Sequence, residues 1–175
     1  MTNPVTAFTG KFLQVLIDQK WEYAARVNSS DVVAIAALVE DHLVLTEQFR
    51  HPVQANVIDL PAGLVGDEAD APDEAAQSAA ERELEEETGF VAKSWTEAIT
   101  VPTSPGLTAE TVRIFVAHDL SRTSHGGGVG QEEITVHLVR RDGLIDFFTR
   151  QQAAGKMIDP KVYVALHLLD FRPTS

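Results

Sequence analysis

The sequence predicts an α+β fold in which a mixed β-sheet lies between layers of helix. Its first half consists of short apolar runs separated by polar turns, which is the pattern of β-strands. An acidic amphipathic segment follows, then further strand-like runs, and two segments with helical spacing close the chain. Elements in this order fit a sheet that is covered by helices on both faces. The 175 residues are enough for one such domain with a full core.

The expected elements are short and bounded by polar residues. Strands are predicted at residues 11–17, 21–27, 32–39, 43–49, 57–60, 91–100, 112–118 and 134–139. Helices are predicted over the acidic segment and at residues 143–154 and 160–169. The run at 32–39 is the most apolar, so we expect a buried strand there. Residues 1–28 form a β arm that precedes a domain at residues 29–175 and needs a surface on which to pack.

The charge of the chain limits the kinds of partner that it can have. The sequence holds 26 acidic and 14 basic residues, a formal net charge of −12. This charge argues against a surface that binds nucleic acid or an anionic membrane. There are no cysteines, which excludes disulfides and zinc–thiolate sites, and no apolar run is long enough to cross a bilayer. We therefore expect a cytoplasmic protein that acts on a small molecule.

Residues 82–90, Arg-Glu-Leu-Glu-Glu-Glu-Thr-Gly-Phe, hold the most informative pattern in the chain. On a helix, Glu83, Glu86 and Glu87 lie three and four positions apart, so their carboxylates share one face. Carboxylates this crowded repel one another, and hard metal ions prefer such oxygen ligands. Arg82 can pair with Glu86 one turn further on. The alternative is an acidic helix face in water, which leaves the order of the residues unexplained.

The same segment has the features of a helix that packs on a core. Ala76, Ala80 and Leu84 are spaced by four residues and make an apolar stripe opposite the glutamates. Gly89 marks the end of the helix, because glycine adopts the left-handed conformation without a side-chain clash. Pro72 suits the first turn of a helix, so we expect the helix to begin near it.

This arrangement resembles the core of the Nudix box, with Arg82, Glu83, Glu86, Glu87 and Gly89 at matching positions. The resemblance implies a Nudix-type α/β/α sandwich with a mixed sheet and an N-terminal β arm. It also implies a metal-dependent pyrophosphohydrolase, which cleaves a nucleoside diphosphate linked to another group. In such an enzyme a water between metal ions attacks one phosphorus, and the metals stabilise the charge that develops.

The resemblance also implies roles for single residues. The metal ions, Mg²⁺ or alternatively Mn²⁺, would be bound by Glu83, Glu86, Glu87 and the backbone carbonyl of Ala62. Arg82 and Glu86 would belong to the catalytic residues.

The rest of the box departs from the family pattern. The family has a glycine where this chain has Glu68, and the natural counterpart is Gly63. The loop is therefore longer than usual, which leaves the role of Glu74 open. Asp59 stands where a glutamate usually precedes Leu-Pro-Ala-Gly. A contact that needs the longer side chain would be lost or relayed through water.

Four phrases outside the box resemble the ADP-ribose pyrophosphatase branch of the family. Trp21 and Glu22 match an aromatic, acidic patch that binds adenine. There the base stacks on the ring, and the carboxylate accepts a hydrogen bond from the exocyclic amine. Arg50, in Glu-Gln-Phe-Arg-His-Pro, matches an arginine that reaches the substrate phosphates. The alternative for the first phrase is ordinary packing of aromatic side chains on a strand. The alternative for the second is an arginine on the surface without a role in binding.

The third phrase precedes the strand at 112–118. It resembles the loop around the terminal ribose, where glycine would allow close approach of the backbone. The residues concerned are Ser104, Gly106 and Leu107. An ordinary Pro-Gly turn gives the same letters.

The fourth phrase contains four glycines in residues 124–130, which indicate a mobile loop, followed by Glu132 and Glu133. It resembles the loop that brings a catalytic glutamate over the diphosphate. We favour Glu133 over Glu132 as the general base. A carboxylate that binds no metal is freer to take a proton than one of the clustered acids.

The implied reaction is the hydrolysis of ADP-ribose, or a related ADP-sugar, to AMP and ribose 5-phosphate. Another nucleotide sugar or dinucleotide, such as GDP-mannose, UDP-glucose or NADH, is an alternative, because base and sugar pockets vary on one catalytic frame. A non-catalytic ADP-ribose sensor is a further alternative. The resemblance also implies a homodimer in which the arm lies across the partner subunit.

Overall fold

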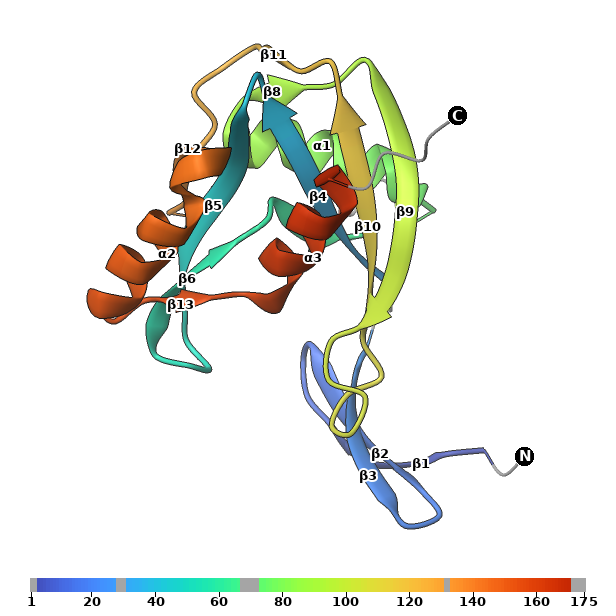
Figure 1. The fold of residues 1–175 in the computed structure, drawn as a ribbon. Helices are drawn as coiled ribbons and strands as arrows, with labels where there is room; N and C mark the ends of the chain where they lie inside the picture. Colours follow the sequence, from blue (N-terminus) through green and yellow to red (C-terminus); the bar gives the residue numbers. More distant parts are fainter. Residues whose placement is uncertain (1–2, 28–30, 67–72, 131–132, 171–175) are drawn as a thin grey trace.

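The central sheet of the protein runs between two layers of helix (Figure 1). The structure is a computed structural model, which describes residues 3–27, 31–66, 73–130 and 133–170. The main path of the sheet has the spatial order β13-β6-β5-β4-β10-β9. These strands are β4 (Asp31–Val39), β5 (His42–Arg50), β6 (Ala55–Asp59), β9 (Ser94–Pro102), β10 (Thr111–His118) and β13 (Met157–Ile158). Beside this path, β7 (Ala62–Leu64) pairs with β4, and β12 (Thr135–Arg140) pairs with β5.

The sheet is mixed, as the sequence predicts. β4 and β10 run parallel, and so do β6 and β13, whereas β5 is antiparallel to β4 and β6. Parallel strands cannot be joined by a tight turn, so a long connection separates β4 from β10. The acidic helix α1 (Ala76–Thr88) lies within that connection.

Side chains of β4 alternate between the two faces of the sheet. Ile35 packs in a core with α1, whereas Ala34 packs in a core with α2 (Leu144–Ala153) and α3 (Pro160–Asp170). Alternate side chains of one strand thus meet helices on both sides, which explains why the run at 32–39 is apolar throughout. The predicted α/β/α sandwich is confirmed. No helix in the described part of the chain is long and apolar enough to cross a membrane.

The acidic helix begins later than the sequence predicts. α1 starts at Ala76, so the expectation that Pro72 lies in its first turn is wrong; Pro72 itself is outside the described residues. Glu74 gives the physical reason. Its carboxylate binds Arg82 and the N–H of Gly66, which holds it in the loop before the helix.

The apolar stripe and the end of α1 agree with the prediction. Ala80 and Leu84 are fully buried. Gly89 caps the helix with φ 74°, and its N–H donates to the Glu85 carbonyl at 2.8 Å. The helix is therefore held on its apolar side, and its acidic side is left for the site.

The strand expected at 91–100 is two strands, because residues 92 and 93 are not in strand conformation. The first, β8 (Phe90–Val91), pairs with β11 (Ser121–Arg122), and the second is β9. A single turn of 3₁₀ helix, η1 (Arg141–Gly143), precedes α2.

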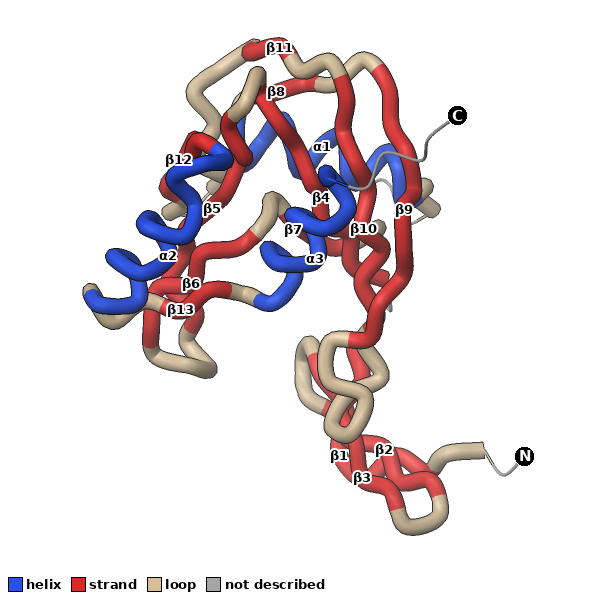
Figure 2. The backbone as a smooth tube through the Cα atoms, viewed as in Figure 1, coloured by secondary structure: helices blue, strands red, loops and turns tan. Residues whose placement is uncertain are grey.

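The arm forms a separate antiparallel sheet that projects from the body of the molecule (Figures 1 and 2). Its strands are β1 (Val5–Thr9), β2 (Leu13–Asp18) and β3 (Trp21–Arg26), and β1 was not among the expected strands. The arm meets the loop between β9 and β10, where Ala24 N–H donates to the Leu107 carbonyl at 2.9 Å. No residue of these three described strands is buried, so the arm has no core of its own.

Candidate active site

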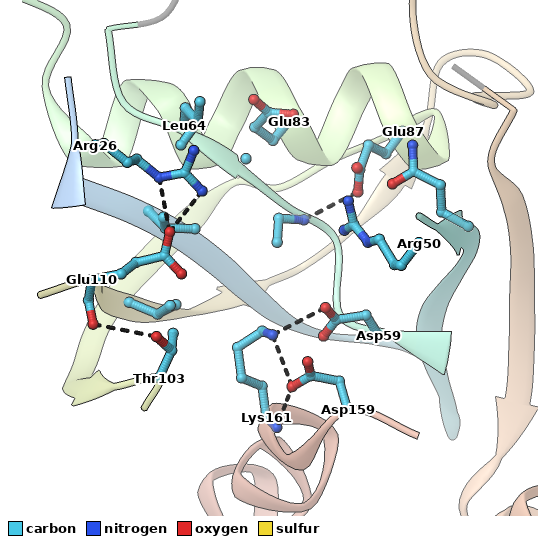
Figure 3. Close-up of a pocket in the computed structure, with 15 residues that line it drawn as sticks. Arg26, Arg50, Asp59, Leu64, Glu83, Glu87, Thr103, Glu110, Asp159 and Lys161 are labelled. Carbon is cyan, nitrogen blue, oxygen red and sulfur yellow. Dashed lines mark hydrogen bonds and ion pairs between the residues drawn. The ribbon is translucent and has the colours of Figure 1, made fainter. Parts of the chain in front are cut away.

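A pocket of about 450 Å³ opens between α1, the sheet and the beginning of α3 (Figure 3). α1 contributes Glu83 and Glu87, and β7 contributes Ala62 and Gly63. The charged and polar residues that line the rest of it are Arg26, Gln48, Arg50, Asp59, Thr103, Glu110, Asp159 and Lys161. Segments far apart in the chain therefore meet around one cavity.

Arg82 donates several hydrogen bonds beside this pocket. Its guanidinium donates to both oxygens of Glu74, at 3.1 and 3.2 Å, to Glu83 at 2.8 Å and to Glu86 at 3.3 Å. It also donates to the Leu64 carbonyl at 3.2 Å. Burial alone would lower the pKa of Arg82, but the hydrogen bond that it donates to Glu74 and the charge of Glu83 outweigh burial and raise the pKa. The predicted pair of Arg82 and Glu86 is confirmed.

Glu74 keeps its place beside the box in spite of the longer loop. Its Oε2 accepts the N–H of Gly66 at 3.1 Å in addition to the bond from Arg82. The Arg82 bond lowers the pKa of Glu74 most, burial opposes it, and the Gly66 bond lowers it further. Glu74 therefore fastens the loop after β7 to the arginine that orders the box.

β7 lies directly against the carboxylates of α1. A Cβ atom on Gly63 would overlap the carboxylate of Glu83, so a larger residue there would displace that side chain. The Ala62 N–H donates to Oε2 of Glu87 at 3.1 Å. The N–H and C=O of one residue in an antiparallel strand point to the same side, so the Ala62 carbonyl also faces α1.

The side chains at this face suit a hard divalent ion. Glu83, Glu86, Glu87 and the Ala62 carbonyl offer oxygen atoms alone, the ligands that Mg²⁺ and Mn²⁺ accept. Glu83 and Glu87 are only 9% and 6% exposed, so their charges are poorly solvated and favour a nearby cation. Within the described residues, no group of three His, Cys, Asp or Glu side chains is arranged to hold a metal ion. Glu83 and Glu86 instead contact Arg82, and binding a metal between them requires them to turn.

The glycine segment, Gly126 to Gly128, closes the end of α1. Gly127 N–H donates to the Glu87 carbonyl at 2.8 Å, and Gly128 N–H donates to the Glu86 carbonyl at 3.1 Å. A Cβ atom on Gly126 would collide with the backbone at the end of the helix. Because the last carbonyls of a helix have no partner within it, these bonds cap the turn that carries the two glutamates. The loop expected to be mobile is thus fixed to α1 in its first part.

The structure brings together four of the expected site residues. Those that line the pocket are Arg50, Ala62, Glu83 and Glu87. Arg82 and Glu86 adjoin them on α1. Glu133 is exposed and is not among the residues that line the pocket, and Glu132 lies outside the described residues.

The residues expected to contact the base and the ribose do not line the pocket of their own chain. Trp21 is 55% exposed, and Glu22 beside it is also exposed. Ser104, Gly106 and Leu107 belong to the loop that meets the arm, and they do not line the pocket. Nothing lies within 4 Å of a Cβ atom built on Gly106, so no close approach within the chain requires this glycine.

Sequence reasoning missed several residues of the pocket. Arg26, from the arm, donates from Nε to Oε2 of Glu110 at 2.8 Å, across 84 positions of sequence. Lys161 binds Asp59, with Nζ and Oδ2 3.0 Å apart. Asp59 is therefore bound directly by a lysine, and the expected loss of a contact that needs the longer glutamate side chain stays a prediction. No local pattern signals these residues, because each pair joins distant segments.

Comparison with known proteins identifies the family. The sequence matches the NUDIX domain over residues 29–159, and the chain belongs to the Nudix family. The "Methanol dehydrogenase activator" of Bacillus methanolicus is 33% identical over 141 residues, which are 81% of this chain and 72% of that protein. The "ADP-ribose pyrophosphatase" of Bacillus subtilis is 31% identical over 121 residues, 65% of this chain and 63% of that protein.

A solved structure supports the same fold. A crystal structure of an ADP compounds hydrolase matches with a TM-score of 0.65 and 24% identity, over 83% of this chain and 80% of that chain. The interpretation of residues 82–89 as a Nudix box is confirmed by the family match. A Nudix hydrolase is therefore the class that the fold, the box and the comparisons define.

The contact between the glycine segment and α1 predicts a selective loss of stability. We expect Gly126→Ala to lower the free energy of unfolding by about 2–4 kcal/mol, because the methyl group meets backbone in addition to a strained left-handed φ of 67°. Gly130→Ala is a matched control, with φ 66° and nothing within 4 Å of its Cβ, and should lose about 1 kcal/mol. Urea denaturation measures both. Equal losses would contradict a capping role.

The lowered pKa of Glu74 predicts a pH-dependent contribution to stability. A carboxylate whose folded pKa lies below its ordinary value of 4.5 stabilises the fold above that value. This contribution is lost as the pH falls through the folded pKa. The destabilisation by Glu74→Gln should therefore be largest near neutral pH and shrink below about pH 4.5, because protonated Glu74 and Gln are both neutral.

Urea denaturation of wild type and Glu74→Gln over a series of pH values checks this expectation. Glu81→Gln, at an exposed position of the same helix, is the control and should differ little from wild type throughout. A loss for Glu74→Gln that stays constant down to about pH 3 would mean that the ion pair does not titrate as expected.

Proposed function

We propose that this chain is a metal-dependent pyrophosphohydrolase that cleaves ADP-ribose, or a related ADP-sugar, to AMP and ribose 5-phosphate. The observation that carries the proposal is one pocket that holds two of the three box glutamates, Glu83 and Glu87, and two arginines, Arg26 and Arg50. Its volume of about 450 Å³ lies in the range of small-molecule sites. The printed name of the Bacillus subtilis relative supports this choice of substrate.

The divalent ion, Mg²⁺ or alternatively Mn²⁺, would be held by Glu83, Glu86, Glu87 and the carbonyl of Ala62. When bound, such ions lower the pKa of a water to make a nucleophile and neutralise charge on the phosphates. Arg82 binds two of these carboxylates, Glu83 and Glu86, in the described structure, and they would turn from it toward the ion.

The two arginines would bind the diphosphate in the same pocket. A guanidinium is permanently charged and donates in a planar fork that matches phosphate oxygens. Arg50 is exposed at the end of β5, so it can turn toward the substrate without loss of a buried contact. Glu133 is our choice for the general base, with Glu132 as the alternative, since neither belongs to the metal-binding cluster.

We also propose a homodimer built through the arm. A three-stranded sheet without a core is marginally stable alone. The arm also exposes apolar side chains on its strands and on the turn between β1 and β2, namely Val5, Phe8, Phe12, Leu13, Val15 and Trp21. A second copy that covers this face could also bring Trp21 and Glu22 to the pocket of its partner. This arrangement would reconcile their adenine-binding role with their absence from the pocket of their own chain.

Product analysis by phosphorus NMR tests the proposed reaction. Purified protein with Mg²⁺ should convert ADP-ribose to AMP and ribose 5-phosphate, and EDTA should abolish this. GDP-mannose, UDP-glucose, NADH and ATP, as parallel substrates, should be cleaved more slowly. If ADP-ribose survives while another compound is cleaved, the choice of substrate is wrong; if nothing is cleaved, a sensor is the better interpretation.

Variants of the box provide the matching control. Glu86→Gln and Glu87→Gln should each lower turnover at least about a hundredfold while the fold survives, because each removes a charged metal ligand. Glu85→Gln lies on the same helix but is exposed and binds the Thr123 hydroxyl at 3.0 Å, so it should stay close to wild type. Near-normal turnover of the first two variants would disprove the assignment of Glu86 and Glu87 as metal ligands.

Light scattering after size exclusion tests the dimer. Wild type should have the mass of two chains, and Phe8→Glu with Phe12→Glu should have the mass of one, because buried carboxylates would oppose the interface. The monomeric variant should also have a raised KM for ADP-ribose. Ile145→Glu, at a residue that is 79% exposed on α2, is the control and should stay dimeric. A monomeric wild type would disprove this assembly.

A further inference from the structure

Lys161 lies in the wall of the pocket that faces α1 across the cavity (Figure 3). It belongs to the first turn of α3, and its Nζ lies 3.0 Å from Oδ2 of Asp59 and 2.8 Å from Oδ1 of Asp159. All three side chains line the pocket, and we call them the lysine cluster. The cluster takes no part in the reaction as proposed above.

The lysine cluster has hydrogen-bonding groups left over. An ammonium has three N–H donors, and two of those of Lys161 are accounted for by the aspartates. Oδ1 of Asp59 accepts the Leu60 N–H at 2.7 Å, and Oδ1 of Asp159 accepts the Lys161 backbone N–H at 2.8 Å. Among the described residues, the third N–H of Lys161 and Oδ2 of Asp159 have no hydrogen-bond partner. The wall therefore offers one donor and one acceptor side by side.

The charges of the cluster favour neutral groups over anionic ones. Burial works against the charged form of Lys161, but the two aspartates outweigh it and raise its pKa, so the lysine is an ammonium at neutral pH. Burial raises the pKa of Asp59, so the wall is neutral when Asp59 is protonated and negative when it is ionised. In neither state does the wall attract phosphate, and it suits hydroxyl groups, each of which both donates and accepts.

We propose that the lysine cluster binds adjacent hydroxyl groups of the sugar at the end of the substrate away from the adenosine. This inference rests on the proposed function, which assigns the diphosphate to α1 and the arginines and the adenine to the arm. The lysine cluster, at the start of α3 and the end of β6, lines the pocket that also holds Glu83, Glu87 and both arginines, so a sugar joined to a diphosphate bound there comes within its reach. One of its hydroxyls accepts from Lys161, and its neighbour donates to Asp159.

A purely structural role is the competing interpretation, because the same bonds tie β6 to α3. The two roles differ in what they do to different substrates. A structural defect weakens the binding of every substrate alike, whereas loss of a hydroxyl contact affects only substrates that carry the hydroxyl. The ethyl ester of ADP keeps the adenosine diphosphate and lacks the sugar, so it is the matched probe for ADP-ribose.

Two variants remove the contact without leaving a buried charge unpaired. Asp159→Asn removes the charge but keeps an oxygen that can cap the Lys161 N–H, since asparagine caps a helix about as well as aspartate. The double variant Asp59→Asn with Lys161→Met removes a cation and an anion together. Lys156→Met is the control, because Lys156 binds Glu47 at 2.8 Å, is comparably shielded and does not line the pocket.

Steady-state kinetics of each protein with both probes tests the proposal. Wild type should have a KM for ADP-ribose at least about tenfold below that for the ethyl ester. Both pocket variants should raise the KM for ADP-ribose about tenfold, change kcat little, and leave the KM for the ethyl ester within about twofold of wild type. Lys156→Met should leave both values within about twofold.

The outcomes separate this inference from the function on which it rests. Equal increases of KM for both probes would show that the lysine cluster is structural only, and unchanged values would show that the sugar does not touch it. Either result overturns the inference while ADP-ribose hydrolysis stands. If wild type does not cleave ADP-ribose, the proposed function itself fails, and the inference fails with it.

Discussion

The guanidinium of Arg82 lies among three carboxylates and a backbone carbonyl, and the positions of these partners depend on its planar fork. Its bonds to Glu74 and to the Leu64 carbonyl fix the loop between β7 and α1. Its bonds to Glu83 and Glu86 set where the box carboxylates lie when no metal competes for them. Without this cation, the negative side chains would repel one another in a poorly solvated place.

A second constraint comes from the close packing of β7 against α1. Leu84 is fully buried on the opposite side of the helix, so the acidic face must turn toward the strand. The two elements lie so close that a Cβ atom on Gly63 would overlap the carboxylate of Glu83 as it is placed here. The backbone of β7 thereby becomes part of the site, since the Ala62 N–H donates to Glu87 and the Leu64 carbonyl accepts from Arg82.

Local patterns in the sequence predicted the features of α1 that depend on residues close in the sequence. Spacing alone predicted the buried stripe of α1 with Leu84, the cap at Gly89 and the pair of Arg82 and Glu86, because their partners lie within a turn of helix. The start of the helix was mispredicted, because Glu74 forms bonds outside the helix that a propensity for proline at the first turn does not reveal.

Pairs of distant residues could not be predicted in the same way. Arg26 and Glu110 are 84 positions apart, and nothing near either residue signals the other. Lys161 at the start of α3 and Asp59 at the end of β6 are also far apart in the sequence, yet they form an ion pair. The glycines at 126–128 were interpreted as a sign of mobility, whereas the fold uses their small size to bring backbone against α1. A run of glycines indicates conformational freedom, but it does not show which segment packs against them.

The cap on α1 has a consequence for the order in which the protein assembles. The helix can form its early turns from neighbouring residues, but the bonds that close its last turn come from residues 127 and 128. These residues follow β10 and β11 in the chain, so the turn with Glu86 and Glu87 is completed only after those strands have been made. The glutamates are present early in synthesis, yet the geometry that orders them is a late, nonlocal product of folding.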